Sequence, residues 1–214
     1  IDAVVSYTLD VAQDAKLSFG LKAGGNILSL DFSRLRNFDA EPVSADNIDN
    51  QFSPNFGLGV YYHTERFYAG LSVPNILESE YFDNSQQDAN DVQFLSTERM
   101  NFYFITGYVF DLNYNLKFKP AILTKVVSGA PLQLDLSASF LFSEKFSFGA
   151  AYRWDAAFSG LIGFQLSEQL MLGLAYDRET TELGGTQFND GSFEILLRWE
   201  LIKSFERMVS PRFF

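Results

Sequence analysis

The sequence predicts an all-β protein, and more specifically a transmembrane, antiparallel, up-and-down β-barrel. Hydrophobic residues alternate with polar or small residues at a period of two over most of the chain, which is typical of strands with two unlike faces. The 23 Phe, 10 Tyr and 2 Trp residues favour strands over helices. No stretch approaches the roughly 18 continuous apolar residues that a transmembrane helix needs.

The alternation is clearest in the segment that spans residues 145–155. One face of this segment carries Phe146, Phe148, Tyr152 and Trp154, and the other carries Ser147, Gly149 and Arg153. A charged side chain that faces lipid costs about 2–4 kcal/mol at the middle of a bilayer. We therefore expect the aromatic face to contact lipid and Arg153 to face the barrel interior.

About eleven segments with this pattern follow one another as an antiparallel meander. They span residues 3–11, 16–34, 53–63, 66–75, 99–111, 115–127, 131–143, 145–155, 158–167, 169–178 and 191–201. Short turns alternate with longer connections, as in outer-membrane barrels, which place their short turns on the periplasmic side. We expect residues 1–201 to form the barrel and residues 202–214 to form a periplasmic tail. Pro120 cannot donate a ladder hydrogen bond, so it predicts a local bulge or bend.

The parity of the strands predicts how the barrel closes. Closed bacterial barrels usually have an even number of strands and both termini in the periplasm. The strands of this chain begin on one side of the membrane and end on the other, so we expect an odd number of further N-terminal strands. The first and last strands, near Val5 and Leu197, should then not pair with each other.

Charge and composition exclude several classes of function. The net charge of −11 would repel nucleic acid, and the absence of Cys excludes disulfides and thiolate chemistry. The single histidine, His63, falls at the end of an expected strand with no catalytic partners that the sequence places beside it. The acidic stretches 37–52 and 76–98 lack the spacing of an EF-hand and are interpreted as solvated loops. We expect no enzymatic activity, no cofactor and no metal site.

Charged residues on the expected inner face are candidate contacts for a partner. Lys117, Lys119 and Lys125 share one face of one strand, where they either attract an acidic peptide or plug or balance nearby carboxylates. The full set of candidate lumenal contacts is Lys117, Lys119, Lys125, Asp135, Arg153, Asp177, Glu194 and Arg198.

Glycine and apolar residues on the same face predict that the barrel interior is occluded by protein. Glycine in a strand often marks the close approach of another backbone. The glycines concerned are Gly20, Gly57, Gly59, Gly70, Gly107, Gly149, Gly163 and Gly173. The occluding segment is either the loop 76–98, which carries Ile76, Leu77, Tyr81, Phe82, Phe94 and Leu95, or part of a partner.

Particular stretches of the chain carry a family resemblance. They are LKFKPAILTKVVSGAPLQLDLSASFLFSEKFSFGAAYRW at 116–154, FSGLIGFQLSEQLMLGLAYD at 158–177 and the tail SPRFF at 210–214, with weaker agreement from LSFGLKAG at 17–24 and LDFSRL at 30–35. With them the chain resembles the PorP/SprF family of type IX secretion-associated outer-membrane proteins of Bacteroidetes. The family's extended N-terminal region has no counterpart here, so the resemblance implies a complete barrel of about fourteen strands.

The resemblance also implies a location and partners. A family member would lie in the bacterial outer membrane, surrounded by lipid, and would anchor or help to display a secreted adhesin through the adhesin's C-terminal domain. It would also associate with periplasmic components of the type IX secretion or gliding machinery. A candidate docking tail for the latter is formed by Ser210, Pro211, Arg212, Phe213 and Phe214. The alternative is an outer-membrane transport channel for small or hydrophobic solutes.

Overall fold

The computed structural model describes residues 1–30, 48–78, 80–81, 96–97, 99–181 and 190–201. These residues form strands and their connections, and none of them forms a helix long and apolar enough to cross a membrane. The strands of the main sheet are β1 (Asp2–Ala12), β2 (Ala15–Leu30), β3 (Ile48–His63), β4 (Phe67–Val73), β7 (Asn101–Tyr108), β8 (Phe110–Asn113), β9 (Leu116–Val127), β10 (Gln133–Phe142), β11 (Phe146–Arg153), β12 (Ala157–Gln165), β13 (Leu170–Glu179) and β14 (Ser192–Trp199). Two short strands, β5 (Glu80–Tyr81) and β6 (Ser96–Thr97), pair separately with each other.

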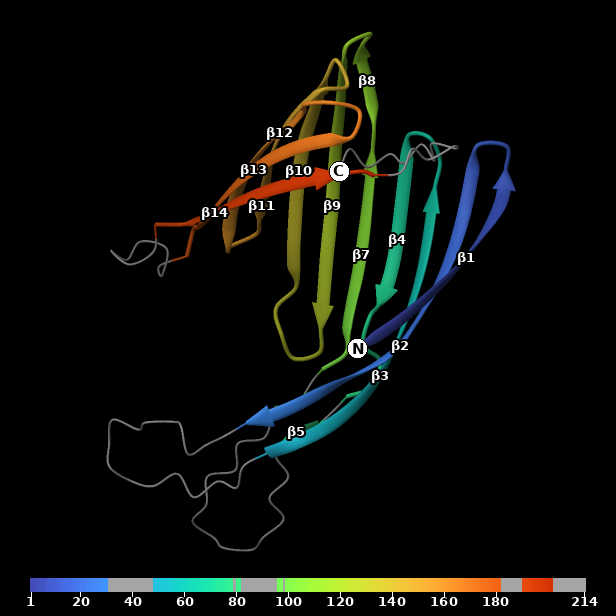
Figure 1. Ribbon diagram of the computed structural model, residues 1–214, viewed down its shortest axis with the longest axis vertical. Helices are drawn as coiled ribbons and strands as arrows, with labels where there is room; N and C mark the ends of the chain where they lie inside the picture. The colour runs from blue at the N-terminus through green and yellow to red at the C-terminus, as the bar shows by residue number, and fades with distance from the viewer. Residues whose placement is uncertain (31–47, 79, 82–95, 98, 182–189, 202–214) are drawn as a thin grey trace, which may run out of the picture.

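The main sheet has twelve strands and an up-and-down topology, as the alternation predicts. Each strand pairs antiparallel with its neighbour along the chain, in the order β1-β2-β3-β4-β7-β9-β10-β11-β12-β13-β14, with β8 also pairing with β9. The sheet curves strongly (Figure 1). It stays open, with β1 and β14 as its two edge strands. The prediction that the first and last strands do not pair with each other is confirmed.

The two ends of the strands differ in their connections. At the end that we call the turn end, short turns join β1 to β2, β3 to β4 and β8 to β9, toward the upper part of Figure 1. At the opposite end, the loop end, longer connections leave β2, β4 and β13. The β10–β11 turn has positive φ at both central residues, Ser143 (51°) and Glu144 (56°). Such turns match the twist of a tight hairpin.

The two faces of the sheet separate polar from apolar side chains. The concave face, which we call the inner face, buries polar groups such as Asn55, Lys119, Ser139 and Ser147. On the convex outer face, Phe148, Tyr152 and Trp154 are exposed. Arg153 alternates with these residues and lies on the same face as Ser147, so the predicted orientation of this strand is confirmed.

Aromatic side chains form two bands on the outer face. Near the turn end, a row of rings crosses neighbouring strands with centroid separations of 4.6, 6.2, 4.8 and 5.1 Å, and it contains Tyr108, Phe110, Phe118, Phe140 and Phe148. Near the loop end lie Tyr152, Trp154, Phe158, Tyr176 and Phe193, with the last two rings 4.6 Å apart. Aromatic girdles on either side of an apolar band are typical of barrels that cross a membrane.

Pro120 interrupts a ladder without shifting its register. The N–H of Val109 donates to the carbonyl of Arg66, on the β4 side, at 2.7 Å. Because the backbone N–H and C=O groups of successive residues point to opposite sides of a strand, those of Tyr108 point toward β9. Tyr108 lies opposite Pro120, which has no N–H to donate, and the break between β7 and β8 falls here. Gly107 opposes Ala121 before the break and Phe110 opposes Phe118 after it, so no residue is inserted. Of the expected bulge or bend, the bulge is therefore absent at Pro120, and a gap in hydrogen bonding lies there instead.

Candidate functional site

The strongest charged contact on the inner face joins β10 to β11 near the loop end. Asp135 and Arg153 are direct cross-strand partners. The guanidinium donates from Nε to Oδ1 at 2.9 Å and from Nη2 to Oδ2 at 3.1 Å. Gln133 adds a bond from Nε2 to Oδ2 of Asp135 at 3.4 Å, and Asp177 of β13 attracts Arg153 electrostatically. Three of the predicted contacts thus meet in one cluster.

The three lysines of β9 have different surroundings. Lys117 pairs with Glu144 of the β10–β11 turn at 3.2 Å. Lys119 is 8 % exposed and lies opposite Ser139. The Lys125 ammonium lies 5.7 Å from the centre of the Tyr103 ring, toward the loop end.

The candidate residues therefore fall into two groups. Lys125, Asp135, Arg153, Asp177 and Glu194 lie toward the loop end of the inner face, and we call them the loop-end group. Lys117, Lys119 and Arg198 lie toward the turn end, where Arg198 pairs with Glu200 at 3.4 Å. The lysines share a face, as the sequence predicts, but they do not converge on one point. The candidate docking tail 210–214 lies outside the described residues.

A segment of the chain itself lies on the inner wall. Residues Pro74–Leu77, which we call the inner strap, follow β4 and return across β3. The buried Asn55 side chain holds them, since its Oδ1 accepts from the N–H groups of Ile76 at 2.9 Å and Leu77 at 3.1 Å. Its Nδ2 donates to the carbonyl of Leu77 at 2.9 Å. Asn55 was not among the residues predicted from the sequence, although a polar residue between the apolar Pro54 and Phe56 was a signal for it.

The strap also explains one inner-face glycine. A Cβ on Gly57 would lie 2.6 Å from the carbonyl oxygen of Pro74, so only glycine allows this approach of the strap. Gly70 and Gly107 have another cause, because a Cβ there would meet the rings of Tyr61 and Tyr68 at 2.9 and 2.6 Å. A backbone thus approaches closely at Gly57, whereas those two glycines accommodate tyrosine side chains, and the occlusion of the interior stays a prediction.

Most of the loop 76–98 that was expected to fold inward lies outside the described residues, so this expectation stays a prediction. The apolar residues Phe82, Phe94 and Leu95 lie outside the described residues. Within the described part of the chain, no three His, Asp or Glu side chains gather as metal ligands would. His63 ends β3 and its ring lies 5.6 Å from that of Tyr61.

The fold and its two faces define a class of protein. An up-and-down antiparallel sheet with an apolar, aromatic-banded outer face and charged pairs inside is the wall of a membrane β-barrel. The family model described as "Type IX secretion system membrane protein PorP/SprF" matches residues 1–199, and the chain belongs to this family. The resemblance carried by the sequence is thereby confirmed. None of the curated proteins matches the chain.

Proposed function

We propose that this protein is a non-enzymatic outer-membrane β-barrel that anchors or helps to display a secreted surface protein. The family supports a place in the type IX secretion machinery. The inner strap supports the anchoring role, because its contacts with Asn55 and Gly57 place a backbone segment against the inner wall. The C-terminal segment of a secreted adhesin would use the same kind of contact.

The loop-end group is the proposed contact for that partner. Arg153 remains about half exposed, with 47 % of its side chain accessible, although Asp135 pairs with it. Glu194 lies on the edge strand β14 and is exposed. Charged groups that are already positioned by the sheet provide selectivity for a polar segment more than they provide affinity.

The orientation of the barrel assigns the two ends to different partners. Short turns face the periplasm in outer-membrane barrels, so the loop end would face outward and receive the secreted protein. The turn end and the tail formed by Ser210–Phe214 would then meet periplasmic components of the secretion or gliding machinery.

Site-specific crosslinking tests the proposal with a matched pair of neighbours. Ala151 lies on the inner face beside Arg153, whereas Ala150 lies on the outer face. A photoreactive residue at position 151 should crosslink to a secreted protein in native membranes, and one at position 150 should not. Equal crosslinking from both positions, or none from position 151 while the protein remains in the membrane, would refute the inner face as the contact.

The runner-up function is a transport channel, because charged side chains on an inner face also suit a water-filled pore. Conductance in planar bilayers separates the two functions. An anchor whose interior is occluded should be silent, and a silent barrel that conducts only after deletion of residues 76–98 would identify the loop as the plug. Steady conductance of the intact protein at the level of a general porin would favour the channel.

A further inference from the structure

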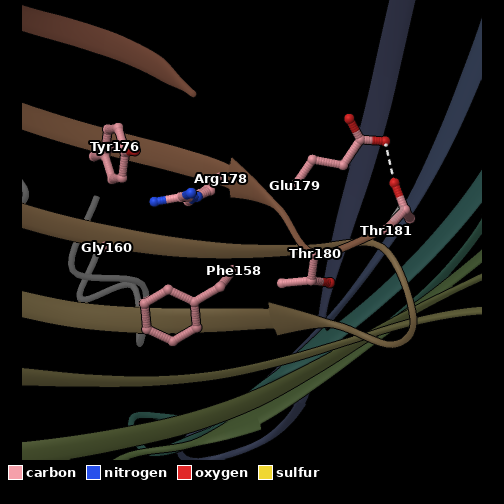
Figure 2. A pocket seen from close by; sticks show the side chains of 7 residues that line it. All are labelled: Phe158, Gly160, Tyr176, Arg178, Glu179, Thr180 and Thr181. Carbon is pink, nitrogen blue, oxygen red and sulfur yellow. Dashed lines mark hydrogen bonds between the residues drawn. The ribbon is translucent and has the colours of Figure 1, made fainter. Parts of the chain in front are cut away.

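A hollow lies on the outer face at the loop end, between β12 and β13. Its volume is about 530 Å³. It is lined by Phe158, Gly160, Tyr176, Arg178, Glu179, Thr180 and Thr181 (Figure 2). It lies within the loop-end aromatic band, the level at which a membrane meets its headgroups.

Arg178 places a positive charge on a wall that is otherwise apolar. It is the direct cross-strand partner of Phe158, which is exposed on the outer face, and it alternates with Tyr176 on the same face. Arg66, Arg153 and Arg198 each form an ion pair with a carboxylate. Among the described residues, no carboxylate forms such a pair with Arg178, which is exposed.

The neighbouring acid is engaged elsewhere. Glu179 accepts a hydrogen bond from the Thr181 hydroxyl at 2.9 Å, on the side of the hollow away from Phe158 (Figure 2). Within the described part of the chain, the charge of Arg178 is thus left for a ligand on the outer side. A guanidinium binds phosphate oxygens through two parallel donors, and Thr180 also lines the hollow.

The rest of the hollow is shaped for an apolar chain. A Cβ built on Gly160 would meet no atom within 4 Å, so the wall is recessed between the rings of Phe158 and Tyr176. Tyr176 is held in place by its hydroxyl, which donates to the carbonyl of Asp190 at 3.0 Å, and by the adjacent Phe193 ring. A cationic rim above an apolar recess matches a lipid, in which a phosphate and an acyl chain are joined.

We propose that this hollow binds one membrane lipid through its phosphate headgroup. Arg178 pairs with the phosphate, and an acyl chain covers Gly160. The site rests on the membrane placement in the proposed function, but it is independent of the inner face and of any secreted partner.

Native mass spectrometry of the detergent-purified, delipidated protein tests the site. Phosphatidylglycerol is the probe, a glycosyl diacylglycerol without phosphate is the control lipid, and inorganic phosphate is the competitor. One molecule of phosphatidylglycerol should be retained per chain, the phosphate-free lipid should bind about tenfold more weakly, and inorganic phosphate should not displace the lipid. Displacement of the lipid by inorganic phosphate would refute a lipid site and would indicate a site for free anions.

Three variants separate the contributions of the site. Arg178→Gln should weaken retention about tenfold, while Arg66→Gln, which removes the same charge at the turn end, should not change it. In Gly160→Leu the new Cβ would have no atom within 4 Å, and the rest of the side chain should block the acyl chain, so this variant should also release the lipid. Equal retention by wild type and Arg178→Gln would overturn the proposal. Crosslinking from position 151 should be unchanged in Arg178→Gln, so failure of the lipid site and failure of the anchoring function give different results.

Discussion

Asp135 and Arg153 stand directly opposite each other on β10 and β11, and their side chains form a two-point ion pair on the inner face. A slip of one residue in either strand would move one partner to the outer face, since side chains alternate across a sheet. The pair therefore marks the register between β10 and β11. It is also a polar contact with two hydrogen bonds within the proposed binding site.

The coupling energy between Asp135 and Arg153 should be small but measurable. A double-mutant cycle with Asp135→Asn and Arg153→Gln should give about 0.5–1 kcal/mol in the free energy of unfolding, because solvent screens the half-exposed guanidinium. Urea titrations of the refolded protein in micelles measure it. The Lys117–Glu144 pair serves as control, and its more exposed carboxylate should couple more weakly. Equal coupling of the two pairs would contradict this assignment.

Charge placed on the outer wall should destabilise the protein far more than the same charge inside. Ile162 lies on the outer face, and its neighbour Leu161 lies on the inner face opposite Gly149. Ile162→Arg should reduce the free energy of folding into phospholipid vesicles by about 2–4 kcal/mol, and Leu161→Arg should have a clearly smaller effect. Vesicle-folding titrations in urea give both values. A larger effect at Leu161 would invert the two faces.

Asn55→Ala should release the inner strap. The N–H of Leu77 would lose its acceptor, and the loss of one such hydrogen bond costs about 0.5–1.5 kcal/mol. Hydrogen exchange at Leu77 should accelerate by about tenfold or more. Asn101→Ala removes an amide that donates to the Arg99 carbonyl, and it should leave this exchange unchanged. Unchanged protection of Leu77 in Asn55→Ala would contradict the role of Asn55.

Gly57→Val should displace the strap by steric conflict, because its Cβ would lie 2.6 Å from the Pro74 carbonyl oxygen. Gly59→Ala is the matched control, since a Cβ there meets its nearest neighbour at an ordinary 3.6 Å. Cleavage at Glu78 by a glutamate-specific protease should become faster in Gly57→Val and stay unchanged in Gly59→Ala. Similar cleavage rates in both variants would argue against the close approach of the strap.

The sequence by itself determined the strands and their faces. Alternation is a local property, so the orientation of Arg153 toward the interior and of Phe148 toward the outside could be predicted from neighbouring residues alone. The short strands β5 and β6 were not predicted, because two residues carry too little periodicity. Pro120 predicted a bulge or bend and not a break between β7 and β8, because a missing donor does not reveal whether the register shifts.

Only the tertiary structure decided which side chains meet. Asn55 and Leu77 are 22 residues apart, and Lys117 and Glu144 are 27 apart, so their contacts depend on register across strands and not on local pattern. The inner-face glycines depend on tertiary structure in the same way. The strap backbone lies against Gly57 and a tyrosine ring lies against Gly107, although both positions have the same pattern in the sequence. A residue's face follows from its own strand, whereas its partner follows from how the neighbouring strand and its connections are placed against it.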